Sequence, residues 1–197
     1  MSIARWGIIT GRVIGKASGN KGNYGEMIVS SIFDTRFFGK EEHYIVDNII
    51  FEPKQGETHQ IDHIVIYKTG VFVIETKHMK GIIKGKEDDY QWVQVVGKKI
   101  YPTLNPINQN QTHVKIVNAF LEDNYDVHSI VVFSRSNKPK EVPEFVLNLE
   151  ALKDYVKYYK SNNELSSEQM QKIYNSLVEY KNNCNVTKKD HVSNISK

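Results

Sequence analysis

Apolar and polar residues alternate in five short segments in the first half of the chain, and this period of two predicts β-strands. The segments cover residues 43–52, 60–67, 71–77, 81–85 and 91–96. Turn-forming residues separate them, and a further turn is expected at 97–99. Connections this short join neighbouring strands as hairpins, so at least half of the sheet is expected to be antiparallel.

Residues 24–33 place apolar residues at helical spacing, which predicts a helix with a buried stripe of Met27, Ile28, Ile32 and, at its end, Phe33. Glu26 is expected in the first turn, where the helix dipole favours a carboxylate. A purely structural role at the start of the helix would therefore explain Glu26 without any chemistry.

The second half of the chain predicts helices around one more strand. Asn105 can cap a helix that begins with Pro106 and ends near Leu121. The continuous apolar segment 129–133 is typical of a strand buried on both faces, so an αβ unit is expected to close the sheet. Two amphipathic helices are expected near residues 149–159 and 166–180.

Length and pattern together indicate one domain with short appendages. The 197 residues are enough for one full core. We expect an N-terminal arm over residues 1–22, a domain over 23–181 that includes the C-terminal helices, and a polar tail over 182–197. The predicted class is α/β, with a mixed, mostly antiparallel central sheet flanked by helices.

Charge and cysteine content restrict the function only weakly. The formal net charge is +3, so recognition of a nucleic acid would depend on a local basic patch. No run of eighteen apolar residues is present, which argues against stable membrane insertion. The single Cys184 cannot form an internal disulfide, and no cleavable leader is recognisable, so a cytoplasmic location is expected.

Two acidic residues stand in the predicted hairpin where apolar residues would suit a sheet better. Side chains alternate faces along a strand, so Glu75 and Lys77 point the same way. With a short loop at residues 67–70, Asp62 lies opposite Glu75. A register shifted by one residue would instead place Asp62 opposite Thr76.

Two carboxylates in this cross-strand position need compensation. Like charges about 5 Å apart repel by roughly 3 kcal/mol at an effective dielectric constant near 20. Protonation of one carboxyl group, a bound cation or solvent exposure would each offset the repulsion. A hard ion such as Mg²⁺ or Mn²⁺ suits clustered carboxylates, and Lys77 could then stabilise charge on a phosphate, a combination suited to phosphodiester hydrolysis. Without metal, Lys77 is expected to pair with one carboxylate.

The arrangement of Asp62 on one strand and Glu75-Thr76-Lys77 on the next resembles the active-site motif of the PD-(D/E)xK nuclease superfamily. A wider set of segments between residues 23 and 133 resembles the nuclease-related domain (NERD) family. That set is Gly25-Glu26, Gln60 to His63, Gly70 to Lys77, Gly81, Gly85, Trp92, Asn105-Pro106, Gln109 and His113. Ile61 departs from the pattern, since many superfamily members have proline before the aspartate.

The resemblance implies a restriction-endonuclease-like α/β core and a metal-dependent nuclease, with DNA as the expected substrate and Mg²⁺ or Mn²⁺ as the cofactor. It implies that Asp62 and Glu75 are metal ligands and catalytic residues, and that Lys77 is the catalytic lysine. Glu26 matches the position of the acidic residue that completes the metal site in related nucleases.

Several further residues have both a functional and a simpler interpretation. Gln109 and His113 match family positions four residues apart on one helix face, but polar packing would explain them equally well. Lys80 and Lys84 are expected to contact phosphates, although a solvated sheet edge would also place them outside. Trp92 is expected in the core rather than as a platform for bases.

Two histidines near the acidic pair do not suggest a zinc site. His59 and His63 lie about 13 Å apart along an extended strand, which is too far to share one metal. His63 points to the face opposite Asp62 and is expected to be a hydrogen-bonded core residue.

Two kinds of function remain open at this stage. One is a nuclease that hydrolyses phosphodiester bonds, and the other is a non-catalytic module on the same scaffold that binds nucleic acid or protein. A membrane-peripheral protein is a third, less favoured interpretation. The sequence fixes neither the choice between DNA and RNA nor the oligomeric state.

Overall fold

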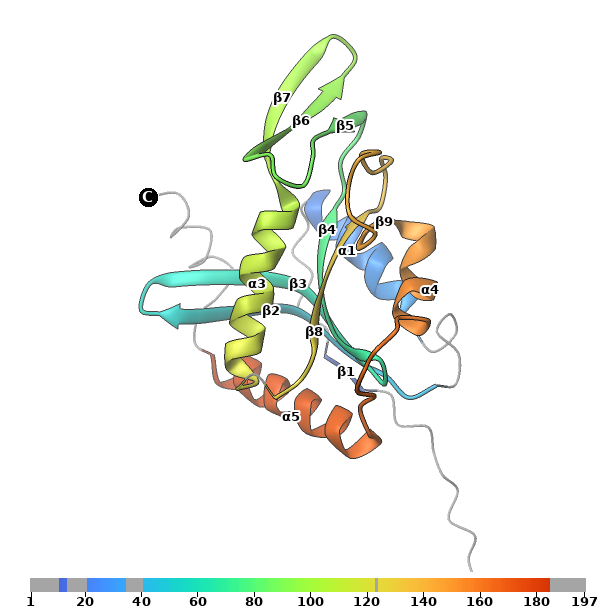
Figure 1. Ribbon diagram of the computed structural model, residues 1–197. Coiled ribbons are helices and arrows are strands. Elements are labelled where there is room, and N and C mark those ends of the chain that lie inside the picture. The colour runs from blue at the N-terminus through green and yellow to red at the C-terminus, as the bar shows by residue number, and fades with distance from the viewer. Residues whose placement is uncertain (1–10, 14–20, 35–40, 123, 185–197) are drawn as a thin grey trace, which may run out of the picture.

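The computed structural model describes residues 11–13, 21–34, 41–122 and 124–184. Within these residues the chain forms a six-stranded mixed sheet with helices on both faces, together with a three-stranded sheet that stands apart from it (Figure 1). The strand order of the central sheet is β1-β2-β3-β4-β8-β9. The predicted α/β class is confirmed, and the architecture is consistent with a restriction-endonuclease-like fold.

The strands are β1 (Gly11–Val13), β2 (Tyr44–Lys54), β3 (Glu57–Tyr67), β4 (Gly70–Lys77), β5 (Ile82–Lys84), β6 (Gln91–Val96), β7 (Lys99–Leu104), β8 (Val127–Phe133) and β9 (Val146–Asn148). The helices are α1 (Lys21–Ile32), α3 (Pro106–Phe120), the 3₁₀ helix η1 (Leu149–Ala151), α4 (Leu152–Lys157) and α5 (Ser167–Asn183).

The central sheet combines both strand directions. Its longest strands, β2, β3 and β4, form an antiparallel meander. The separate three-stranded sheet of β5, β6 and β7 is antiparallel throughout. The pairs β1–β2, β4–β8 and β8–β9 are parallel. The sheet is therefore mixed as predicted, but within the described central sheet its antiparallel part is confined to the meander.

Three strands were not predicted. β1 lies in the segment expected to be only an N-terminal arm. β7 begins at Lys99, inside the turn expected at 97–99, and its Pro102 argued against a strand, because proline is compatible with a sheet only at an edge such as this one. β9 has three residues, which is too short to show a period of two.

The expectations for the first helix were partly wrong. α1 begins at Lys21, so Glu26 lies in its second turn and no acidic residue occupies the first. Phe33 is buried as expected, but Met27 is 58% exposed and Val29, which was not expected in the stripe, is fully buried. The stripe is rotated because α1 packs on a sheet face lined by β3, β4 and β8, a contact that helical periodicity alone does not specify.

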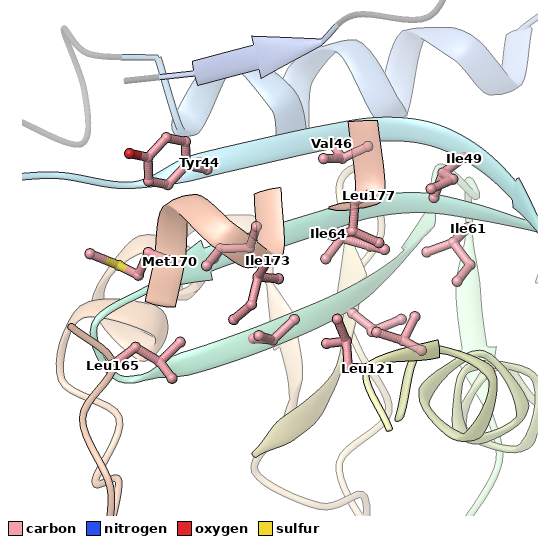
Figure 2. Packing of buried hydrophobic residues seen from close by; sticks show 14 of the residues in the cluster. Tyr44, Val46, Ile49, Ile61, Ile64, Leu121, Leu165, Met170, Ile173 and Leu177 are labelled. Carbon is pink, nitrogen blue, oxygen red and sulfur yellow. The ribbon is translucent and has the colours of Figure 1, made fainter. Parts of the chain in front are cut away.

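Two apolar layers hold the helices against the central sheet. One face of the sheet packs against α3 and α5, and Figure 2 shows Ile173 and Leu177 of α5 lying over Val46 and Ile64. The other face packs against α1 and α4. The sheet is therefore buried on both sides, as is usual where parallel strands occur.

The described residues bear only in part on the predicted appendages. Of the arm over 1–22, β1 pairs with β2 at the sheet edge, while residues 1–10 and 14–20 lie outside the described part. At the other end α5 continues through Asn183, and residues 185–197 of the predicted tail lie outside. None of the helices in the described ranges combines the length and apolarity needed to span a bilayer.

Candidate active site

The hairpin β3–β4 has the register expected from the sequence. Ile66 pairs with Val71 and Ile64 with Val73. The paired backbone ends at His63 and Ile74, and the next position in this register places Asp62 opposite Glu75.

The backbone around Asp62 is irregular. In the β2–β3 pair, regular pairing skips Asn48, which has a φ of 53°, and Asp62, and it resumes at Ile49 and Ile61. On the other side of β3, the Thr76 N–H donates to Asp62 Oδ2 over 2.8 Å. A side-chain carboxylate thus takes the place of a strand-to-strand backbone bond, which opens the sheet at this point. Such interruptions are common next to active sites.

Lys77 lies between two side-chain oxygens. Its Nζ donates to Glu75 Oε1 over 2.6 Å and to Gln109 Oε1 over 2.9 Å. The expected ion pair with a neighbouring carboxylate is therefore present. Gln109 comes from the first turn of α3, so the helix and the strand jointly fix the position of the ammonium group.

The buried carboxylate of Glu75 also approaches α3. His113 Nδ1 lies 3.6 Å from Glu75 Oε2, and both side chains are almost completely buried. The His59 ring meets the His113 ring edge-on at 6.1 Å. Gln109 and His113 are thus brought to the acidic pair from one helix face, as their spacing of four residues allows.

Asn110 fixes α3 to the sheet and was missed in the sequence. It is fully buried, and its Nδ2 lies 2.8–3.0 Å from Ser129 Oγ, Val73 O and Ile130 O. Because these acceptors belong to β4 and β8, Asn110 sets the height of Gln109 and His113 above the strands. A polar residue in the stripe that contains Ile107 and Val117 was the available signal.

Glu26 reaches the site because α1 crosses close to the end of β4. A Cβ atom on Gly25 would lie 2.5 Å from His78 Cβ, so only glycine permits this approach. Tyr24 meets the His78 ring edge-on at 5.5 Å. The glycine before Glu26 is therefore a packing requirement rather than a turn signal.

The charges of the site act together on Asp62. Burial raises the pKa of the Asp62 carboxyl group well above its ordinary value, and the charges of Glu75 and Glu26 raise it further. The Thr76 N–H and the Lys77 ammonium group lower this pKa, but do not cancel the increase. All three acidic residues predicted for the site are thus electrostatically coupled.

The donor set suits a hard cation, although the ligands are not assembled around one. No three acidic, histidine or cysteine side chains within the described ranges are arranged to hold a metal ion. Mg²⁺ is usually bound through one or two carboxylates and several waters, which Asp62 and Glu75 could supply. Lys77 occupies one oxygen of Glu75, so metal binding would require this ion pair to adjust.

The remaining predicted residues lie outside this cluster. Lys84 lies on β5, Lys80 lies in the segment leading to it, and both are exposed. Trp92 is buried, as expected. His63 lies on the opposite sheet face, where its Nδ1 is 2.8 Å from Asp47 Oδ1, which confirms its prediction as a hydrogen-bonded core histidine.

Comparison with known proteins agrees with this geometry. The family model described as the nuclease-related domain (NERD) matches residues 21–134, a range that begins with α1 and ends after β8. An uncharacterized protein of Bacillus anthracis is 30% identical over 167 residues, which cover 80% of this chain and 76% of that protein. No solved structure matches. Because the matched range covers more than half of the chain and contains the whole acidic cluster, the chain belongs to the nuclease-related domain family.

Proposed function

We propose that the protein is a metal-dependent nuclease that hydrolyses phosphodiester bonds in DNA. The observation that carries the proposal is the position of Lys77, which bonds to Glu75 and Gln109 on the same side of the sheet as Asp62. Two acids that can hold a metal ion and a lysine beside them are a set of groups that can promote phosphodiester hydrolysis.

Each residue has a distinct role in this proposal. Asp62 and Glu75 would hold the divalent ion, with Glu26 contributing charge from α1. A bound Mg²⁺ or Mn²⁺ supplies Lewis acidity and lowers the pKa of coordinated water. Lys77 would stabilise the negative charge that develops on the phosphate, and Gln109 positions its ammonium group. Lys80 and Lys84 would contact phosphates on the side of β5.

The test is cleavage of plasmid DNA with and without Mg²⁺. Lys77→Ala and Asp62→Ala should each reduce the rate by a hundredfold or more, since both remove a charge next to the reacting phosphate. Lys172→Ala, at an exposed position of α5, is the matched control and should cleave normally. Full activity of either site variant would refute the assignment.

A non-catalytic binding module is the second candidate. The observation that favours it is the ion pair between Lys77 and Glu75, which already occupies one oxygen of an expected metal ligand. Calorimetric titration with MgCl₂ separates the two functions. The nuclease should bind Mg²⁺ and lose that binding in Glu75→Gln. A module should bind DNA in EDTA without any response to millimolar Mg²⁺.

A further inference from the structure

The three-stranded sheet β5–β7 concentrates exposed apolar side chains. Of the eight large apolar or tyrosine side chains exposed in the described part of the chain, five lie in this sheet or its loops. They are Ile82, Tyr90, Ile100, Tyr101 and Leu104. Contiguous exposed apolar surface generally marks a place where something binds.

Strand pairing gathers most of these residues on one side of the sheet, here called the outer face. The outer face consists of three paired rows: Ile82-Val95-Ile100, Lys84-Val93-Pro102 and Gln91-Leu104. Exposure reaches 61% for Ile82, 67% for Ile100 and 62% for Leu104. Apolar residues therefore stand where a solvated sheet face would carry polar ones.

The inner face of the same sheet is firmly packed. Ile83 and Trp92 are buried in a cluster with Phe133, and the Trp92 and Phe133 rings stack at 6.3 Å. A Cβ atom on Gly85 would lie 2.2 Å from the Trp92 ring. The sheet thus packs against the rest of the protein through its inner face. Because this packing is tight, the exposure of the outer face is not a sign that the sheet is poorly packed.

Charge is distributed unevenly along this sheet. Lys84 lies on the outer face, Lys98 lies in the turn between β6 and β7, and Lys99 is the first residue of β7. The acidic residues lie in the loop at the other end, where Asn105 Nδ2 bonds to Glu87 O and Asp89 O. Lys84 and the two lysines at the β6–β7 turn therefore supply the positive charge that contacts with phosphates require.

The β5–β7 sheet is connected to the candidate active site at both ends of its segment of the chain. Its strands lie in the segment between Lys77 and Gln109, whose side chains bond to each other over 2.9 Å. Gln94 Nε2 on β6 donates to Lys80 O over 2.8 Å, which ties the sheet to the segment following β4. The sheet projects beyond the start of α3, next to the segment that follows β4 (Figure 1).

We propose that the outer face of β5–β7 binds an unpaired strand of the nucleic-acid substrate next to the cleavage site. In this arrangement, which rests on the proposed nuclease function, Ile82, Ile100 and Leu104 contact bases, and Lys84, Lys98 and Lys99 contact phosphates.

Two physical arguments select this partner. Aliphatic side chains gain no binding energy from contact with phosphates. The apolar faces of bases are accessible only where the strand is unpaired or unstacked. A second copy of the same face would bury the Lys84 ammonium group of each copy among apolar side chains, which is unfavourable. The substrate class is therefore DNA with a single-stranded segment, such as a gap, a flap or a tail.

The experiment measures binding in EDTA, so that cleavage does not interfere. The probes are a fluorescein-labelled oligothymidylate and the same strand annealed to its complement. The single strand should bind more tightly than the duplex. Ile82→Ser/Ile100→Ser should weaken single-strand binding about tenfold, while Tyr158→Ser, at a 75% exposed site near the end of α4, should not.

A second measurement tests the basic turn. Lys98→Ala/Lys99→Ala should lower the slope of log affinity against log salt by roughly 0.7 for each phosphate group that the protein no longer neutralises. Melting temperatures verify that all variants fold, and Leu104→Ser replaces the double isoleucine variant if that variant does not.

Three results would overturn the proposal: equal affinity for duplex and single strand, unchanged single-strand binding in both outer-face variants, or a wild-type dimer that Ile82→Ser/Ile100→Ser converts to monomers without loss of binding. The last result would identify the outer face as an interface between copies. Failure of the nuclease function is distinct, because it would appear as absent cleavage while the binding pattern persists.

Discussion

The β3–β4 hairpin and the β5–β7 sheet depart from the ordinary distribution of side chains in opposite directions. In the hairpin, the carboxyl groups of Asp62 and Glu75 stand at positions that are partly or fully buried. In the second sheet, Ile82 and Ile100 expose apolar surface that could have been polar. Both departures cost stability, and natural sequences usually carry such costs at functional sites.

In the proposed nuclease, the two regions have different tasks. Charged groups held in a closed setting suit chemistry, because their positions and energies are fixed by their neighbours. An exposed apolar surface with lysines suits recognition of a flexible strand. Changes in the hairpin should therefore affect turnover, and changes on the outer face should affect binding.

The largest expected effect separates the two faces of the second sheet. Trp92→Ala should lower the free energy of unfolding by about 3 to 5 kcal/mol, because it leaves a large cavity against Phe133. Ile100→Ser removes exposed surface and should change it by no more than about 0.5 kcal/mol. Urea denaturation of both variants gives the values. Similar losses would mean that the outer face is packed in solution.

The next effect separates chemistry from binding. Glu75→Gln should reduce kcat on a tailed DNA substrate by about a hundredfold or more, since it removes a charge that lies 2.6 Å from Lys77 Nζ. Ile100→Ser should leave kcat unchanged and raise KM severalfold. Steady-state kinetics of the two variants provide the test, and a fall in kcat for Ile100→Ser would argue against the division of labour.

A smaller effect concerns how α1 approaches the hairpin. Gly25→Ala places a methyl group 2.5 Å from His78 Cβ, so α1 must shift and carry Glu26 with it. Overpacking of this kind should cost about 1 to 3 kcal/mol of stability and lower the cleavage rate. Ser31→Ala, at an exposed position of the same helix, is the control for both measurements.

The smallest expected effect is a change in the pH dependence of stability. The pKa of Asp62 is raised in the folded protein. The contribution of its carboxyl group to the free energy of unfolding is therefore complete at pH values below the ordinary pKa, and it is lost as the pH rises through the folded pKa. Asp62→Asn removes this loss, so it should stabilise the protein by about 1 kcal/mol at neutral pH and by less near pH 4. Denaturation at several pH values tests this, and a difference independent of pH would contradict it.

Much of the hairpin and of helix α3 could be predicted from the sequence, because both depend on residues close together in the chain. The register follows from a two-residue period and a short loop, and the helix start follows from Asn105, whose Oδ1 accepts from the Ile107 N–H. Nearby residues specify such features before any tertiary contact forms.

The errors arose where distant segments decide the outcome. The burial of α1 depends on strands that begin many residues later, so Met27 could not be identified as exposed. The parallel pairing of β4 with β8 and the edge position of β7 likewise depend on contacts between remote parts of the chain. Asn110 was overlooked because its acceptors lie on two different strands.

The sequence by itself determined which chemical groups the candidate site contains, namely the pair Asp62 and Glu75 and the lysine two residues after Glu75. It also determined the order of the segments around them. Only the tertiary structure decided that Lys77 meets Gln109, that Glu26 acts on Asp62, and that an apolar face is left uncovered beside them. The reason is physical, since periodicity fixes the direction of a side chain within its own element, whereas distances between elements follow from packing the whole core.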